Sequence, residues 1–234
     1  MNKLPGNIDG FDVAAHSFFK AATNAERASL NAQKICQKYK KGEIIFAEDS
    51  HPQGLYWINS GKIKIFKTGF DGKEQIIHWG LPGDLLGYRA LLAEEAYSVS
   101  SEAIEETVAC LIPSRAFINL LDNNRHLNRQ LMKSICHELN LASEKLTSMA
   151  QKNVRERLAE VLLHLHDTFK SEDEADALIN ITLPREDIAN LVGTATETVI
   201  RLLSEFKEDK LVEFEGKRIR LLDKPKLRRV AEMD

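Results

Sequence analysis

The sequence predicts an α+β protein: an antiparallel β jelly-roll barrel, then a long helix, then a helical domain that ends in a β-hairpin. Three observations support this. Short β-branched and aromatic segments recur up to Pro113, an apolar heptad begins at Met132, and two helical patterns precede a hairpin after Thr182. We therefore expect a barrel with an N-terminal helix over residues 1–113, a long helix with a hinge over 114–152, and a third domain over 153–234.

The barrel region begins with a helical pattern over residues 18–37 and then changes to strands. Ser60-Gly61 and Asp71-Gly72 are turn signals between strand-like segments. Many short strands at close spacing indicate an antiparallel barrel or jelly roll. The expected strands are Ile44–Phe46, Leu55–Ile58, Lys62–Phe66, Gln75–Trp79 and Thr107–Ile112.

Composition limits the class of protein. The 234 residues are enough for two modest domains, and a hydrophobic content of 43% with 29% charged residues is ordinary for a soluble protein. No apolar run reaches about 18 residues, so no membrane span is expected. The first residues lack the apolar segment of a secretory signal, so we expect a cytoplasmic protein.

The three cysteines, Cys36, Cys110 and Cys136, are odd in number, far apart and without a Cys-x-x-Cys pair. This pattern argues against a disulfide framework and against a zinc ribbon. Cys110 lies in an apolar, strand-like run, so we expect it to be a buried free thiol. No metal site is expected.

A regular apolar seam follows, with spacing 3-4-3-4-3 over about two and a half heptads. A helix that packs on its own barrel is one explanation, but a seam this regular favours a parallel homodimer. Asn153 lies at its end and is a candidate hinge. The seam residues are Met132, Ile135, Leu139, Ala142, Leu146 and Met149.

Residues 182–206 predict two helices joined by a sharp turn. Pro184 stands where the first helix begins, with Thr182 as its cap, and Gly193 ends it. The second helix, starting at Thr194 or Ala195, is expected to bury Val199, Leu202, Leu203 and Phe206.

The opposite face of the second helix suits a DNA major groove. Arg201 can pair with guanine, and Glu197 can accept from the cytosine amino group. The hydroxyls of Thr194, Thr196 and Thr198 can bind phosphate. The alternative is a plain helical hairpin with a surface Glu197–Arg201 pair worth only ~0.3–0.5 kcal/mol.

A short hairpin after these helices favours DNA binding. Two strands around a turn at Gly216 form the wing of a winged helix, where Lys217, Arg218 and Arg220 can contact phosphates. The net charge of −3 gives no general attraction to DNA, so a local basic face must serve.

A barrel, a long dimer helix and a winged helix in this order resemble the CRP/FNR family of bacterial transcription regulators, from about Lys20 to Leu222. Residues 41–46, 55–61 and 82–87 are similar to the cyclic-nucleotide-binding barrel, and residues 188–203 to the DNA-reading element. The resemblance implies base reading by Glu197 and Arg201 and phosphate contacts by Arg185 and Thr198. It also implies a homodimer on palindromic double-stranded DNA, with RNA polymerase as a partner.

The effector is less clear from the resemblance. Members that bind cyclic AMP have a Glu, an Arg and a Ser where this chain has Tyr88, Ser98 and Val99. A buried cyclic phosphate needs a cation or several donors, which argues against cyclic AMP. Arg89 either points inward or forms a surface ion pair. The candidate effector pocket comprises Gly87, Tyr88, Arg89, Ala90, Ser98, Val99 and Ser143.

The cysteines and histidines limit the other cofactors that members of this family carry. No cysteine precedes Cys36 and only three exist, which argues against an iron–sulfur sensor. Haem stays open, with His78 and His137 as the histidines to examine. Thr196 replaces an Arg that the family often has, so an altered half-site is expected.

Two other functions fit the sequence less well. A cupin-like metal enzyme would need clustered histidines and carboxylates, but only His78 lies in a barrel strand and no nucleophile elbow or phosphate loop occurs. We therefore expect no enzyme. A regulatory subunit acting through protein contacts would leave the winged helix unexplained. The expected function is a dimeric transcription regulator controlled by an unknown small effector, with a haem- or gas-sensing regulator of the same family as the alternative.

Overall fold

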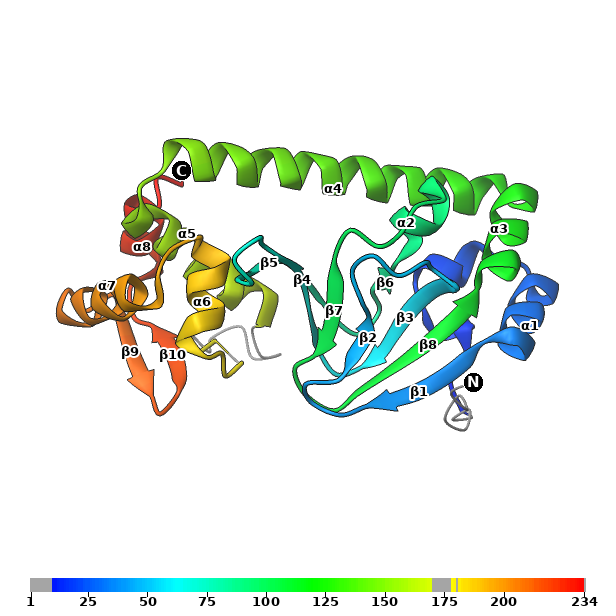
Figure 1. The fold of residues 1–234 in the computed structure, drawn as a ribbon, viewed down its shortest axis with the longest axis horizontal. Coiled ribbons are helices and arrows are strands. Elements are labelled where there is room, and N and C mark those ends of the chain that lie inside the picture. Colours follow the sequence, from blue (N-terminus) through cyan, green and yellow to red (C-terminus); the bar gives the residue numbers. More distant parts are fainter. Residues whose placement is uncertain (1–9, 170–177, 180, 234) are drawn as a thin grey trace. The chain divides into compact units, whose positions relative to one another are not determined.

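The structure, a computed structural model, describes residues 10–169, 178, 179 and 181–233 (Figure 1). The chain divides into two compact units, Met1–Glu138 and Leu139–Asp234, and each is described by itself.

The first unit opens with two 3-10 turns, Val13–Ala15 and Phe18–Ala21, followed by α1 (Asn24–Gln33). Thr23 and Glu26 form a capping box at the start of α1, which satisfies two of its free amide groups. The predicted helix over residues 18–37 is wrong at its end, because Ile35–Tyr39 forms a strand, β1. Pairing with β8, about 70 residues later, decides this conformation.

Eight strands form two antiparallel four-stranded sheets with the orders β1-β8-β3-β6 and β2-β7-β4-β5 (Figure 1). This is a jelly roll, so the predicted fold class is confirmed. Besides β1 the strands are β2 (Ile44–Phe46), β3 (Gly54–Ser60), β4 (Ile63–Thr68), β5 (Glu74–Gly80), β6 (Leu85–Leu86), β7 (Ser100–Ala103) and β8 (Thr107–Pro113).

The five expected strands all occur, while β1, β6 and β7 were not expected. The sequence of β7, Ser-Ser-Glu-Ala, has no β-branched or aromatic residue, and β6 has only two residues. Both are strands because they lie between or beside neighbours that supply their hydrogen bonds. A short helix, α2 (Tyr88–Ala93), follows β6.

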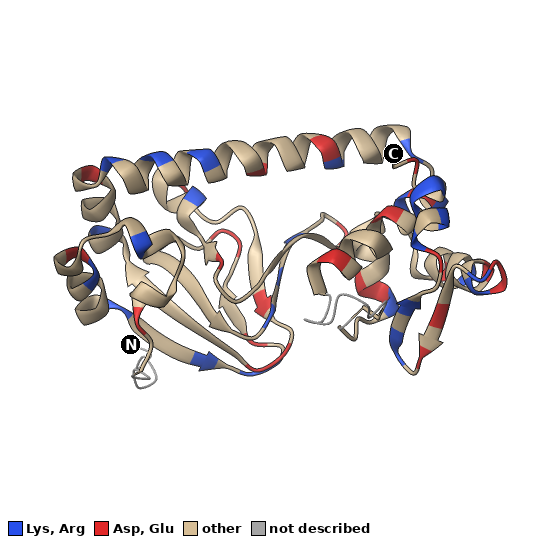
Figure 2. Ribbon diagram, turned by 180° about the vertical axis from the view of Figure 1, so that it is seen from behind, with Lys and Arg blue, Asp and Glu red and all other residues tan. Residues whose placement is uncertain are grey.

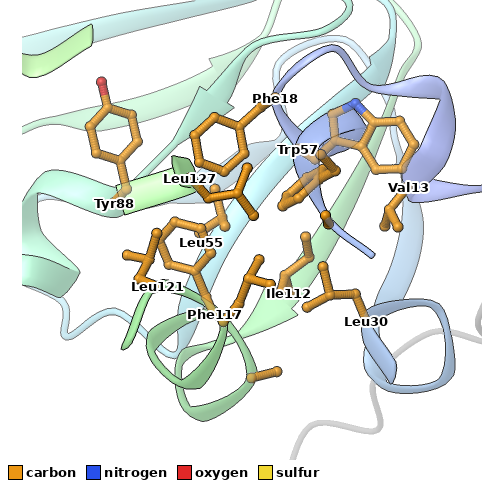
Figure 3. Close-up of a cluster of buried hydrophobic side chains, with 14 of the residues drawn as sticks. Val13, Phe18, Leu30, Leu55, Trp57, Tyr88, Ile112, Phe117, Leu121 and Leu127 are labelled. Carbon is orange, nitrogen blue, oxygen red and sulfur yellow. The ribbon is translucent and has the colours of Figure 1, made fainter. Parts of the chain in front are cut away.

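Two buried clusters hold the first unit together. One joins the N-terminal turns and α1 to β3, β8 and the helices that follow the barrel, with Phe18, Trp57 and Phe117 among its members (Figure 3). The other fills the space between the two sheets, where Phe46 stacks on Tyr97 with ring centroids 4.2 Å apart. The second cluster consists of Ile45, Phe46, Ile58, Ile63, Ile65, Leu86, Tyr97, Ala103 and Ala109.

The expectation for Cys110 needs correction. The residue is fully buried as expected, but its sulfur is bonded to that of Cys36, so it is not a free thiol. The two cysteines lie directly opposite each other in the antiparallel β1–β8 pair. The two cysteines are 74 residues apart in the chain, so no local sequence pattern predicts that they pair. Cys136 is free and exposed.

Two helices follow the barrel, α3 (Ser114–Asn123) and α4 (Arg125–Gln151). The apolar seam on α4 is largely uncovered in the single chain: the exposed fractions are 55% for Met132, 67% for Leu139, 70% for Leu146 and 41% for Met149. Ala142 is exposed as well, whereas Ile135 is half-buried against the first cluster.

The second unit contains α5 (Val154–Phe169), α6 (Arg185–Val192), α7 (Thr196–Glu208), the strands β9 (Val212–Glu215) and β10 (Arg218–Leu221), and α8 (Lys224–Val230). Asn153 stands between α4 and α5, where its Oδ1 accepts the amide of Arg155 at 2.9 Å. The helix therefore breaks at the position predicted for a hinge, and Asn153 caps the next helix. No helix of the described part of the chain is long and apolar enough to cross a membrane.

Candidate functional site

The two helices α6 and α7 form the predicted helix-turn-helix. Gly193 ends α6 in a left-handed conformation with φ 73°, which a residue with a side chain adopts at a cost. The predicted capping role of Thr182 is wrong. Because α6 begins at Arg185, Pro184 occupies the cap position, and Thr182 lies two residues upstream of it and is exposed.

One face of α7 is buried and the other is open. Val199, Leu202, Leu203 and Phe206 are buried as predicted. Its N-cap is Ala195, which has no side-chain oxygen, so no side chain caps the first amide groups of α7. On the open side Glu197 and Arg201 are exposed, and Thr194, Thr196 and Thr198 are half-buried at the start of the helix.

The surface ion pair on α7 is not the one considered from the sequence. Arg201 bonds the carboxylate of Glu205, one turn further along, instead of Glu197. Glu205 also accepts from Arg155 of α5 at 2.7 Å. Sequence reasoning missed Arg155 and Glu205, although an Arg and a Glu four residues apart on α7 was a readable signal.

The hairpin β9–β10 forms the wing, with Gly216 in its turn at φ 61°. Lys217 and Arg218 are exposed, whereas Arg220 bonds Glu215 on the neighbouring strand. Figure 2 shows Lys and Arg (blue) on the turn, on β10 and on α8, while β9 carries the acidic residues (red) Glu213 and Glu215.

Arg185 links the helix-turn-helix to the wing. Its guanidinium carbon lies 5.1 Å from the centre of the Phe214 ring, a cation–π contact. Burial lowers the pKa of the Arg185 guanidinium, which nevertheless stays charged at neutral pH. Arg185 is thus a half-buried cation at the start of α6, in contact with a ring of the wing.

The candidate effector residues gather around α2, except for one. Gly87 precedes α2 with φ 81°, and a Cβ there would lie 3.1 Å from the Tyr97 ring. The buried Tyr88 donates its hydroxyl to Glu138 on α4, and Arg89 Nε lies 3.7 Å from the same carboxylate. Burial, followed by Glu138, raises the pKa of the Tyr88 hydroxyl.

These contacts show which of the two expected orientations Arg89 adopts, inward or in a surface ion pair. Its side chain is 59% exposed and forms the surface ion pair. Ala90 and Val99 are half-buried against the cluster between the sheets, and Ser98 is exposed. Ser143 lies in the second unit, where its hydroxyl donates to the Leu139 carbonyl at 2.9 Å.

The residues present do not fit a cyclic nucleotide. The Tyr88 hydroxyl donates to Glu138, Arg89 is exposed and its charge is paired with the same carboxylate, and Val99 packs on apolar neighbours, so none of them presents an unpaired buried cation to a phosphate. Among the described residues no group of three or more His, Cys, Asp and Glu is arranged to hold a metal ion. His78 and His137, the histidines considered for haem, are exposed.

Comparison with known proteins agrees with this architecture. Residues 36–124 match the model of the cyclic nucleotide-binding domain, and residues 156–230 match the Crp-like helix-turn-helix domain. The chain is 31% identical over 184 residues to the transcriptional activator protein Anr of Pseudomonas protegens, covering 79% of this chain and 75% of that protein. It is also 31% identical over 192 residues to the fumarate and nitrate reduction regulatory protein of Vibrio cholerae, covering 82% and 76%.

Solved structures share the fold. FixK2 from Bradyrhizobium japonicum superposes with a TM-score of 0.74 at 24% identity, covering 84% of this chain and 96% of its own. A CRP-family transcriptional regulator from Thermus thermophilus gives 0.70 at 23% identity, covering 84% and 96%. With the jelly roll, the long helix and the winged helix-turn-helix in one order, the chain belongs to the CRP/FNR family of DNA-binding transcription regulators.

Proposed function

We propose that the chain acts as a homodimer that reads a two-fold symmetric DNA site through α7. The observation that carries this is the open face of α7: Glu197 and Arg201 are exposed on a helix whose other face is buried. In this proposal Arg201 reads guanine and Glu197 reads cytosine. Phosphates are held by Arg185, Thr194, Thr196, Thr198 and Lys217.

The exposed seam of α4 supports the dimer. Leucine and methionine side chains at heptad spacing on one helix face are left uncovered by their own chain. Two copies joined there would present two α7 helices to successive major grooves, about 34 Å apart on the DNA. We further propose that a small effector bound by the barrel shifts the population between two arrangements at the break near Asn153.

This role implies a cellular compartment, a protein partner and a class of effector. A protein that binds chromosomal DNA works in the cytoplasm, and relatives named as activators make RNA polymerase the expected protein partner. The residues around Tyr88 support an effector other than cyclic AMP.

The test is Arg201→Ala on a site selected from a random DNA pool. We expect the variant to lose about 1–3 kcal/mol of specific binding, roughly 5- to 150-fold in Kd, while the dimer persists. Arg228→Ala, an exposed arginine on α8, is the matched control and should leave the ratio of specific to non-specific affinity unchanged. Equal affinities for wild type and Arg201→Ala would remove Arg201 from the base-reading role.

A further inference from the structure

The carboxylate of Glu205 connects the open face of α7 to the inside of the second unit. One oxygen, Oε1, accepts from Nη1 of Arg201, and the other, Oε2, accepts from Nη1 of Arg155 at 2.7 Å. Glu205 therefore holds two arginines at once, one exposed to solvent and one on the neighbouring helix α5.

Arg155 is itself firmly held. Its Nη2 donates to Asp209 Oδ2 at 2.6 Å, and its guanidinium carbon lies 4.7 Å from the centre of the fully buried Phe206 ring. The Arg155 side chain is only 34% exposed. Bonds between charged groups are roughly twice as strong as neutral ones, so Glu205 has a fixed partner on its inner side.

This anchoring distinguishes the Arg201–Glu205 pair from an ordinary surface pair. In a free i,i+4 pair both side chains move, and little order results. Here the acceptor is fixed by a third residue, so the flexible Arg201 side chain, 65% exposed, is held by a rigid group. Immobilising such a side chain at an interface costs ~0.5–1.5 kcal/mol, and part of this cost is met before DNA arrives.

The bond to Glu205 also leaves the Nε and Nη2 donors of Arg201 available to contact a base. The bond to Glu205 uses Nη1, whereas the donors on Nε and Nη2 lie on another edge of the guanidinium. Two parallel donors on one edge match the O6 and N7 acceptors of guanine. Arg201 can therefore keep Glu205 and contact a base at the same time.

We infer that Glu205 is a positioning residue for Arg201 and thereby a determinant of base specificity, with Arg155 as its anchor. This inference rests on the base-reading role proposed above for Arg201. Glu205 can also act against DNA binding, because it competes with DNA for Arg201 and its negative charge repels phosphate. Removal of Glu205 lowers the ratio of specific to non-specific affinity if it positions Arg201, and raises this ratio if it competes with DNA, so the two roles can be distinguished.

The experiment measures the affinity of the full-length dimer for its selected site and for an unrelated duplex. If Glu205 positions Arg201, Glu205→Ala lowers the ratio of specific to non-specific affinity by roughly 3- to 10-fold. Glu208→Ala is the matched control, because it removes an exposed carboxylate from the same helix. It should shift both affinities alike and leave their ratio unchanged. An unchanged or higher ratio in Glu205→Ala overturns the inference.

A double-mutant comparison makes the test specific to Arg201. In an Arg201→Ala background, Glu205→Ala should have no further effect on the ratio, and a persisting effect overturns the inference. If Arg201→Ala alone leaves the ratio unchanged, the proposed base-reading role fails and the inference fails with it. If only Glu205→Ala is silent, base reading stands. Glu205→Gln keeps the size of the side chain but removes its charge, so it should lower the affinity ratio as Glu205→Ala does. The melting temperature of each variant is measured as well, so that unfolding is not mistaken for lost specificity.

Discussion

Replacement of Leu146 by alanine tests whether the seam of α4 joins two copies of the chain. Leu146 is 70% exposed in the single chain and lies on the heptad seam. Alanine is the best helix former, so α4 should stay intact and the melting temperature of the single chain should change little. Any large effect must therefore come from a partner.

The expected size follows from the exposed area. Leu→Ala removes three carbon groups, worth ~0.8 kcal/mol each when fully buried, or ~2.4 kcal/mol. Because 70% of Leu146 is available for new burial, the loss is ~1.7 kcal/mol per chain. The symmetric dimer contains two copies, so the total is ~3.4 kcal/mol, about a 300-fold increase in the dimer Kd.

The assay is sedimentation or mass photometry over a dilution series. Leu141→Ala is the matched control: it is the same change on the same helix, at a residue 46% exposed that lies off the seam. The dimer Kd of the control should change by less than about threefold. A dimer Kd that is unaffected by Leu146→Ala, or equally affected by Leu141→Ala, would refute the seam as the interface.

Two further predictions concern stability. Breaking the Cys36–Cys110 bond, which closes a loop across 74 residues, should lower the unfolding free energy by about 4 kcal/mol on the chain-entropy model. Urea unfolding with and without reductant checks this: wild type should respond and the double variant Cys36→Ala/Cys110→Ala should not, and a wild type indifferent to reductant would contradict it. Burial lowers the pKa of His16 below its ordinary 6.5, although the Gly83 carbonyl and Asp84 act in the opposite direction. The unfolded chain then binds the proton more readily, so stability is fully present above pH 6.5 and declines as the pH falls below it. The neutral His16 accepts the Phe18 amide at 3.0 Å, a bond that protonation removes. His16→Gln should flatten the decline in urea unfolding between pH 8 and 5, and an undiminished slope would show that other groups cause it.

Much of the fold was predictable because it is encoded locally. The apolar spacing after Thr196, the left-handed Gly193 and the turn at Gly216 each specify a conformation within a few residues. The same holds for strands such as β4, whose residues alternate or branch at Cβ. The exposed positions Glu197 and Arg201 also followed from helical periodicity alone.

What the sequence left undecided depends on segments that meet only after folding. Cys36 bonds Cys110 across 74 residues, and Tyr88 bonds Glu138 across 50. Local sequence patterns do not predict such long-range contacts, because the partners of a side chain depend on the tertiary fold.

The partner of Arg201 illustrates both levels. Helical spacing allowed two carboxylates, Glu197 one turn before Arg201 and Glu205 one turn after it, and the order acid-then-base makes Glu197 the better local partner. The structure selects Glu205, which Arg155 holds from a helix 50 residues earlier in the chain. By itself the sequence determined most of the elements and which of their faces are open. The tertiary structure decided which charged groups hold one another, because a third residue from a distant segment overrides the local preference.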